Sequence, residues 1–165
     1  MERKPKVTFL ISMYNIPGNQ LISAIESVLN QTYKNFDILI IDDGTKDNSV
    51  QIINSYKSDK IRIIHNEKNI GLEKSLNKGI QEIKSKYIAR MDTDDISHLD
   101  RIEKQVEFAE KHPEYSIITT RVNLFDDNGI YGSTKITGEI KKEDLLFGTP
   151  FIHPSMLIRT NDIKK

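Results

Sequence analysis

The 165-residue chain contains no cysteine. This absence excludes a disulfide framework, a thiolate nucleophile and a zinc–thiolate site, and it leaves the redox compartment open. The chain also lacks an excess of charge: Lys and Arg number 24 together, Asp and Glu also number 24, and the formal net charge is +0. A balanced charge gives no electrostatic reason to expect a nucleic-acid partner, so we expect none.

Long apolar runs are missing as well. The first apolar stretch, Val7 to Ile11, is too short for the apolar region of a signal peptide and far too short to cross a bilayer. We therefore expect no transmembrane segment in this chain, and a cytoplasmic location, either free or peripheral to the inner face of the membrane. The length and the lack of repeats or linkers predict one domain over residues 1–165.

Glycine-rich phosphate loops are the third absence. Neither the Gly-x-Gly-x-x-Gly pattern of dinucleotide-binding folds nor the P-loop pattern Gly-x-x-x-x-Gly-Lys-Ser/Thr occurs in the chain. A nucleotide bound here would need its diphosphate neutralised by a metal ion, because no backbone cradle of that kind is present.

The first ninety residues alternate between strand-like and helix-like patterns. Short β-branched runs predict strands, and apolar residues at helical spacing predict helices between them. This alternation predicts right-handed βαβ units and an α/β fold with a mostly parallel sheet flanked by helices. The predicted strands cover 7–11, 36–41, 61–65 and 87–91, and the predicted helices cover 20–30, about 48–56 and 72–83.

The last seventy residues are less regular. Their pattern predicts an amphipathic helix over 100–111, one strand over 116–125, a turn at 126–129 and a returning strand over 130–136. A short helix over 141–147 and a last strand within 151–158 follow. We expect Asp47 or Asn48 to cap the second helix.

Polar residues gather after the predicted strands: Ser12 to Tyr14, then Asp42 and Asp43, then Asp92, Asp94 and Asp95. Since ligands of parallel sheets bind beyond the carboxyl ends of the strands, these segments should share one rim. Taken alone, the acidic cluster is either a solvated turn or a site for Mg²⁺ or Mn²⁺, which favour carboxylate oxygens.

The roles of the other rim residues also remain open at this point. Asp42 and Asp43 fit a helix cap or Asx-turn, and they also fit hydrogen bonding to a base or ribose. Tyr14 is either a half-buried aromatic or a ring that stacks on a base. His153 is either an ordinary loop histidine or a donor to a diphosphate.

The order of these motifs resembles the N-terminal, nucleotide-sugar-binding part of family 2 glycosyltransferases, which have the GT-A fold. The agreement runs through nearly the whole chain, and it lies in the stretches 7–15, 27–33, 36–47, 69–72, 76–79 and 87–95, together with Arg101, Gln105 and His153-Pro154-Ser155.

The resemblance implies a role for each matching residue. Ser12 and Tyr14 would line the nucleoside pocket, and Asp43, with Asp42, would meet the base. Asn69, Gly71 and Asn77 would lie beside the nucleotide, and Asp92 near the ribose. Asp94, or its neighbour Asp95, would hold Mg²⁺ or Mn²⁺.

The implied activity is transfer of a sugar from a nucleoside-diphosphate sugar, most often a UDP-sugar, to a hydroxyl of a saccharide or lipid-linked acceptor, with inversion, as in polysaccharide biosynthesis. Family members continue into an acceptor-side segment with a Glu-Asp pair whose Asp is the general base. Glu143-Asp144 precedes His153 and so stands in the wrong order, and we read it as a helix start. We therefore expect a domain that is incomplete at its C-terminal side, with the general base beyond Lys165.

Two other functions remain as alternatives. One is a catalytically incomplete module that only binds a nucleotide sugar. The other is a phospho-accepting receiver-like domain, which also gathers Asp residues at strand ends but needs an acidic pair after its first strand, where this chain has Ser12-Met13.

Overall fold

The computed structural model describes residues 5–134, 138–146 and 148–164. Its centre is a sheet of six strands in the order β3-β2-β1-β4-β8-β5. The strands β1, β2, β3 and β4 run parallel, and β8 is antiparallel to both β4 and β5. These four parallel strands are β1 (Val7–Met13), β2 (Phe36–Asp42), β3 (Ile61–His65) and β4 (Tyr87–Arg90). The predicted α/β class with a mostly parallel sheet is confirmed.

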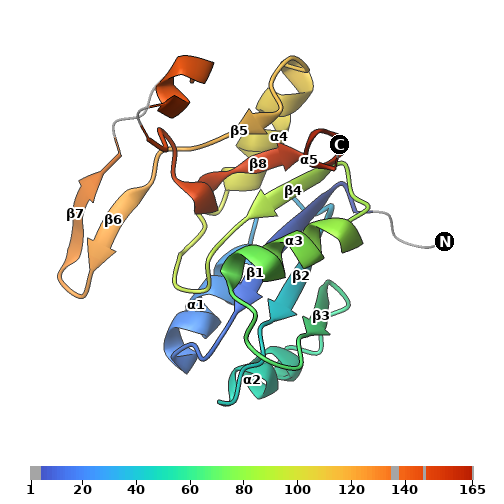
Figure 1. Ribbon diagram of the computed structural model, residues 1–165. Helices are drawn as coiled ribbons and strands as arrows, with labels where there is room; N and C mark the ends of the chain where they lie inside the picture. The colour runs from blue at the N-terminus through green and yellow to red at the C-terminus, as the bar shows by residue number, and fades with distance from the viewer. Residues whose placement is uncertain (1–4, 135–137, 147, 165) are drawn as a thin grey trace.

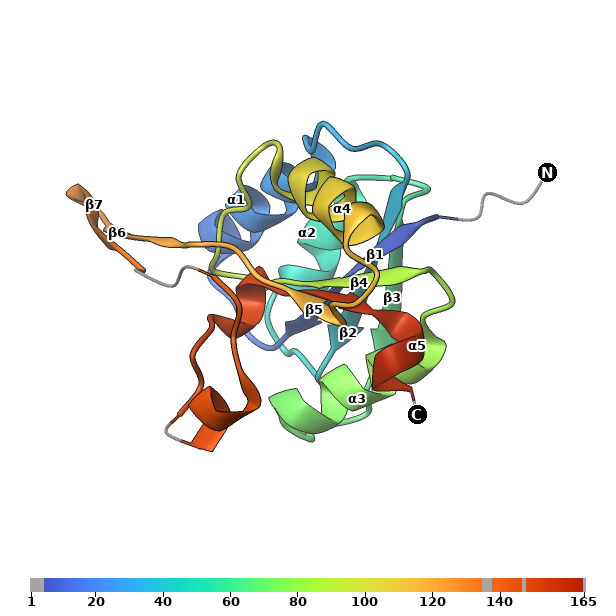
Figure 2. The same cartoon turned by 90° about the horizontal axis from the view of Figure 1, so that it is seen from above.

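Helices cover both faces of the sheet (Figure 2). On one face lie α1 (Gly18–Leu29), α2 (Ser49–Ser55) and α4 (Arg101–Lys111), whose apolar residues share one buried cluster with Phe9 and Ile11 of β1. On the other face lies α3 (Leu72–Glu82), whose Leu76 packs with Leu10 in a smaller cluster. Because neighbouring residues of a strand point to opposite faces, a strand covered on both sides is mostly apolar, as β1 is.

The helix boundaries follow local chemistry. Asp47 rather than Asn48 serves the start of α2: Oδ1 of Asp47 accepts a hydrogen bond of 2.9 Å from the backbone N–H of Ser49, and Asn48 makes no side-chain cap bond. In α3, a Cβ on Gly79 would lie 2.4 Å from Cδ1 of Leu10, so glycine lets this helix approach β1 closely. In α4, Ala109 is buried whereas Phe108 is 44% exposed.

The C-terminal third differs from the prediction. The single strand expected over 116–125 is wrong: the chain forms β5 (Ile117–Ile118) in the main sheet, leaves it, and forms β6 (Asn123–Asp126), which pairs with β7 (Gly129–Ser133). This hairpin, with its turn as predicted, extends away from the sheet (Figure 1). Residues 135 and 136, the end of the predicted returning strand, lie outside the described residues.

The remaining elements are two 3₁₀ turns, one strand of the main sheet and a short helix. The predicted short helix is a 3₁₀ turn, η1 (Lys142–Leu146), and Phe147 lies outside the described residues. The last strand expected within 151–158 is β8 (Leu157–Arg159), which extends one residue beyond that stretch. It follows a second 3₁₀ turn, η2 (His153–Ser155), and precedes the final short helix α5 (Thr160–Ile163). None of the helices in the described part of the chain combines the length and apolar character needed to cross a membrane.

Candidate functional site at the carboxyl edge of the sheet

The carboxyl ends of β1, β2 and β4 meet at one edge. In register, Met13 pairs with Asp42 and Leu10 pairs with Arg90. Beyond the paired residues, the N–H of Asp43 donates to the carbonyl of Met13 at 2.8 Å. The segments at or just beyond the ends of these strands, 12–14, 42–43 and 92–95, therefore lie at the same edge of the sheet, as the parallel strands predict.

The loops after β1 and β2 are joined by side chains. Asn15 adopts a left-handed conformation, with φ of 48°, and its Oδ1 accepts a hydrogen bond of 2.9 Å from the N–H of Lys46. The N–H of Thr45 donates to Oδ1 of Asp42 at 2.9 Å, which closes the turn after β2. Next to this junction Tyr14 is 43% exposed and Ser12 is half-buried. Tyr14 is thus an exposed residue at the rim rather than a core aromatic.

Asp43 is buried, with 2% of its surface exposed, and its carboxylate binds the loop that leads into α3. Oδ1 accepts hydrogen bonds from the N–H of Ile70 and from Nδ2 of Asn66, and Oδ2 accepts one from the N–H of Gly71, each at 2.9 Å. Burial alone would raise the pKa of Asp43, but these bonds stabilise the charged form more, so the pKa is lowered. The carboxylate is ionised and holds this loop.

Two glycines make that arrangement possible. Gly44 has φ of 76°, and a Cβ there would lie 2.7 Å from the carbonyl carbon of Lys68. Gly71 has φ of 92°, precedes the first residue of α3, and donates to Oδ1 of Asn69 as well as to Asp43. The expected neighbours Asn69 and Gly71 are therefore close to Asp43, whereas Asn77 lies exposed further along α3.

Asp42 has a different partner. Its Oδ2 lies 2.8 Å from Nδ1 of His65, the last residue of β3, and its own side chain is 6% exposed whereas that of His65 is 57% exposed. Asp42 thus links the ends of β2 and β3. Sequence reasoning identified Asp42 and Asp43 but missed Asn66 and His65 as their partners, because the partner on a neighbouring strand is set by register.

The acidic cluster lies after β4. Asp92, Asp94 and Asp95 each offer a carboxylate oxygen, and these oxygens lie within 4.8 Å of one another. Burial raises the pKa of Asp95, and the charges of Asp92 and Asp94 raise it further. A divalent cation would relieve this repulsion, and three converging carboxylate oxygens are ligands that Mg²⁺ and Mn²⁺ prefer. The residues therefore fit such an ion.

Arg90, the last residue of β4, lies buried beside this cluster with 3% of its surface exposed. Its Nη1 forms an ion pair with Oδ1 of Asp92, and its Nε has no hydrogen-bond partner among the described residues. His153 is near as well: burial lowers its pKa, the positive charge of Arg90 lowers it further, and Asp92 acts in the opposite sense. The turn η2 is thus part of the site, and an arginine inside an apolar strand was the sequence signal for Arg90.

A second buried arginine holds the backbone around the cluster. Nη2 of Arg101 donates to the carbonyls of Arg90 at 2.9 Å and Met156 at 3.3 Å, and Nε donates to Gln105 at 3.0 Å. Nε2 of Gln105 in turn donates to the carbonyl of Ser155 at 2.9 Å. Burial lowers the pKa of Arg101 to about 10, so it stays protonated at neutral pH. The first turn of α4 therefore fixes β4 and η2 relative to each other.

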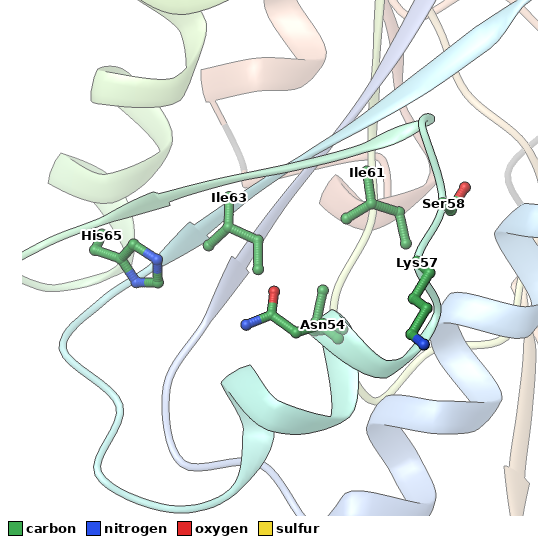
Figure 3. A pocket seen from close by; sticks show the side chains of 7 residues that line it. Asn54, Lys57, Ser58, Ile61, Ile63 and His65 are labelled. Atoms are coloured by element: carbon green, nitrogen blue, oxygen red, sulfur yellow. The ribbon is translucent and has the colours of Figure 1, made fainter.

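Two hollows lie elsewhere on the described surface. One of about 330 Å³ lies between β3 and α2; Ile61, Ile63 and His65 of β3 point toward Asn54 of α2 there (Figure 3). A larger one of about 680 Å³ runs along α4 and β5, at the opposite edge of the sheet. Neither contains a residue of the acidic cluster, and we place the site by its carboxylates because they carry chemistry that the hollows lack.

The fold is shared with solved glycosyltransferases of the GT-A class. S. aureus TarS 1–349 in complex with UDP aligns with a TM-score of 0.79 and 20% identity, over 96% of this chain and 48% of that chain. The mannosyltransferase PcManGT of Pyrobaculum calidifontis, in complex with GDP-Man and Mn²⁺, aligns with a TM-score of 0.64 and 14% identity, over 70% of this chain and 35% of that chain. At these identities the likeness shows the fold alone.

The sequence settles the family. The model of glycosyl transferase family 2 matches residues 8–163, and the chain belongs to that family. The putative glycosyltransferase EpsE of Bacillus subtilis is 36% identical over 164 residues, which cover 98% of this chain and 59% of EpsE. An uncharacterized glycosyltransferase of Haemophilus influenzae is 36% identical over 175 residues, covering 98% of this chain and 54% of the relative. The chain thus spans little more than half the length of these relatives.

Proposed function

We propose that this chain is the donor-binding part of a metal-dependent glycosyltransferase that moves a sugar from a nucleoside-diphosphate sugar to an acceptor hydroxyl. The observation that carries the proposal is the meeting of Asp92, Asp94 and Asp95 at the edge where β1 and β2 also end. A family without a glycine-rich phosphate loop needs another way to neutralise a diphosphate, and a cation held by these carboxylates supplies it.

A UDP-sugar is the donor that we favour. TarS has been solved with UDP and with UDP-GlcNAc, and PcManGT with GDP-Man and Mn²⁺. In this chain the exposed side chain of Tyr14 can stack on a base, and Ser12 lies half-buried two residues before it. Asp43 acts at the same end through the loop that it holds, and Asp42 supports the turn beside it.

The residues divide the chemistry between them. A divalent cation held by Asp94 and Asp95 would supply positive charge for the departing diphosphate. Asp92, held by Arg90, would face the ribose side, and His153 at the start of η2 would donate to the diphosphate. In-line attack by the acceptor hydroxyl would invert the anomeric centre.

The acceptor and the general base are part of the same proposal. A positioned base contributes about 10²–10⁴-fold to such a transfer. Glu143 and Asp144 lie in η1, where Oδ2 of Asp144 accepts a hydrogen bond from the N–H of Lys141, as expected of a helix start. We propose that the base belongs to the part of the longer relatives that this chain does not cover, and that the acceptor is a saccharide or lipid-linked hydroxyl.

The alternatives can be separated. A receiver-like domain is disfavoured by family membership and by Ser12-Met13 at the end of β1. A module that binds a nucleotide sugar without transfer would share the donor site, so donor hydrolysis and transfer assays on this chain and on a longer form distinguish it.

Isothermal titration calorimetry of UDP in the presence of Mn²⁺ tests the donor site. We expect saturable binding that Asp94→Asn weakens at least tenfold, because one carboxylate oxygen ligand is lost. Asp127→Asn is the matched control, since Asp127 is exposed in the β6–β7 turn. Equal UDP binding by wild type and Asp94→Asn would contradict the metal-dependent site.

A further inference from the structure

The charge around the acidic cluster is unusual. Three carboxylates face two buried guanidinium groups: Arg90 pairs with Asp92, and Arg101 interacts electrostatically with Asp95. If all are ionised, the group keeps one net negative charge. Arg90 is 3% and Arg101 9% exposed, so solvent screens these charges little.

The guanidinium of Arg90 is buried but incompletely hydrogen-bonded. Nη1 forms an ion pair with the carboxylate of Asp92, and neither Nε nor Nη1 makes a hydrogen bond within the described residues. Arg101 differs, because its guanidinium donates to two backbone carbonyls and to Gln105. A buried, incompletely bonded guanidinium is costly, so its charge is the property to explain.

We propose that Arg90 is a positioning residue that holds Asp92 and weakens the affinity of the cluster for free metal, so that Mn²⁺ or Mg²⁺ binds strongly only together with the nucleoside diphosphate. The proposal rests on the proposed function, since it concerns the same site. The affinity of an oxygen site for a divalent ion rises with the number of uncompensated carboxylates. With one net negative charge the site is a weak one, and the diphosphate restores the missing negative charge when it binds.

The consequence is reciprocal coupling. If UDP tightens Mn²⁺ binding by some factor, Mn²⁺ must tighten UDP binding by the same factor. For the wild-type chain we expect this factor to be about tenfold or more, as typical coupling free energies allow. Independent binding of Mn²⁺ and UDP to the wild-type chain would overturn the proposal without any variant.

The direct test is titration of free Mn²⁺, followed by electron paramagnetic resonance, in wild type, Arg90→Met and Arg90→Gln. Removal of one positive charge should tighten free Mn²⁺ binding by about tenfold and reduce the coupling to UDP by a similar factor. Damage to the site would weaken Mn²⁺ binding instead, so the direction of the change separates an electrostatic role from a structural one. Unchanged or weaker binding in both variants would overturn the proposal.

Three further variants of this chain serve as controls. Arg62→Met removes a positive charge from an exposed position of β3 and should leave Mn²⁺ binding unchanged. Arg90→Lys keeps the charge and should stay within about threefold of wild type. The double variant Arg90→Met with Asp92→Asn restores the net charge and should bind free Mn²⁺ about as wild type does; much weaker binding would show that Asp92 is itself a metal ligand and would overturn its assignment as the partner of Arg90.

Failure of this proposal is distinct from failure of the proposed function. If wild type binds UDP with Mn²⁺ but the Arg90 variants do not tighten free Mn²⁺, only the role of Arg90 is wrong. If no nucleoside diphosphate binds, the proposed function fails, and the wild-type coupling on which this inference depends fails with it.

Discussion

Two groups of carboxylates lie at the same edge of the sheet and have opposite surroundings. Asp43 is buried and accepts hydrogen bonds from Asn66, Ile70 and Gly71, and its pKa is lowered. Asp95 lies among carboxylates, and its pKa is raised by burial and by Asp92 and Asp94. The first carboxylate is satisfied by its own chain, and the second is left for a cation. Acidic residues that look alike in sequence therefore divide into one that holds the loop before α3 and others that, as we propose, bind a cation.

The largest effect on stability should come from replacing Asp43, whose carboxylate is hydrogen-bonded by its own chain. Asp43→Asn replaces an ionised acceptor by an amide whose NH₂ would face backbone N–H groups, so we expect a loss of about 3 kcal/mol in the free energy of unfolding. Asp94→Asn removes an exposed carboxylate and should change it by less than about 0.5 kcal/mol. Urea denaturation of both variants measures the difference, and equal losses would show that the comparison is wrong.

A backbone change at the same place should have the next largest effect. Gly44→Ala should cost about 2 kcal/mol, because φ is positive and the new Cβ would press on the backbone at Lys68. Gly129→Ala is the matched control, since its φ is also positive but nothing lies within 4 Å of the added Cβ. We expect about 1 kcal/mol for this control. If thermal or urea denaturation shows the same loss for both, the close approach of the two loops is not what makes Gly44 necessary.

Replacement of Asp95 should change the free energy of unfolding in the opposite direction. Because the pKa of Asp95 is raised in the folded chain, its charged form is disfavoured there at neutral pH. Asp95→Asn should therefore stabilise the metal-free protein by about 0.5 kcal/mol while it weakens metal binding. Denaturation without Mn²⁺ measures the stabilisation, and denaturation with Mn²⁺ measures the loss of metal binding. Destabilisation of the metal-free variant would contradict the proposed repulsion between Asp95 and its neighbouring carboxylates.

The smallest effect on stability is expected from a fall in pH. The pKa of Asp43 is lower folded than unfolded, so its contribution is complete above its ordinary pKa and is lost as pH falls through the folded value. The carboxylate of Glu110, near the amino end of β4, behaves in the same way: hydrogen bonds from Tyr87, Lys86 and Lys6 lower its pKa to about 2. Denaturation midpoints between pH 5 and 2 should fall less steeply in Asp43→Asn than in wild type. A parallel fall would contradict the lowered pKa of Asp43.

Several features could be predicted from the sequence because they depend on local patterns. Strands covered on both faces are mostly apolar, and the strands that lead to Asp42 and to Asp92 both show this pattern. Parallel strands place their following residues at one edge, which predicted the meeting of the acidic segments. The split of residues 116–125 into β5 and β6 could not be predicted, since both pieces are β-rich and only pairing with β8 or with β7 distinguishes them.

The sequence by itself therefore determined the class of fold and the succession of parallel strands and helices along the chain. It also determined which acidic residues reach the rim. These features follow from residue spacing and from patterns of apolar residues, which are local properties. Only the tertiary structure decided what each carboxylate meets there. Asp43 meets backbone N–H groups of a loop that Gly44 allows to approach, and Asp92 meets the buried Arg90. These partners come from register and packing between distant segments, and the pKa and charge of each group follow from them.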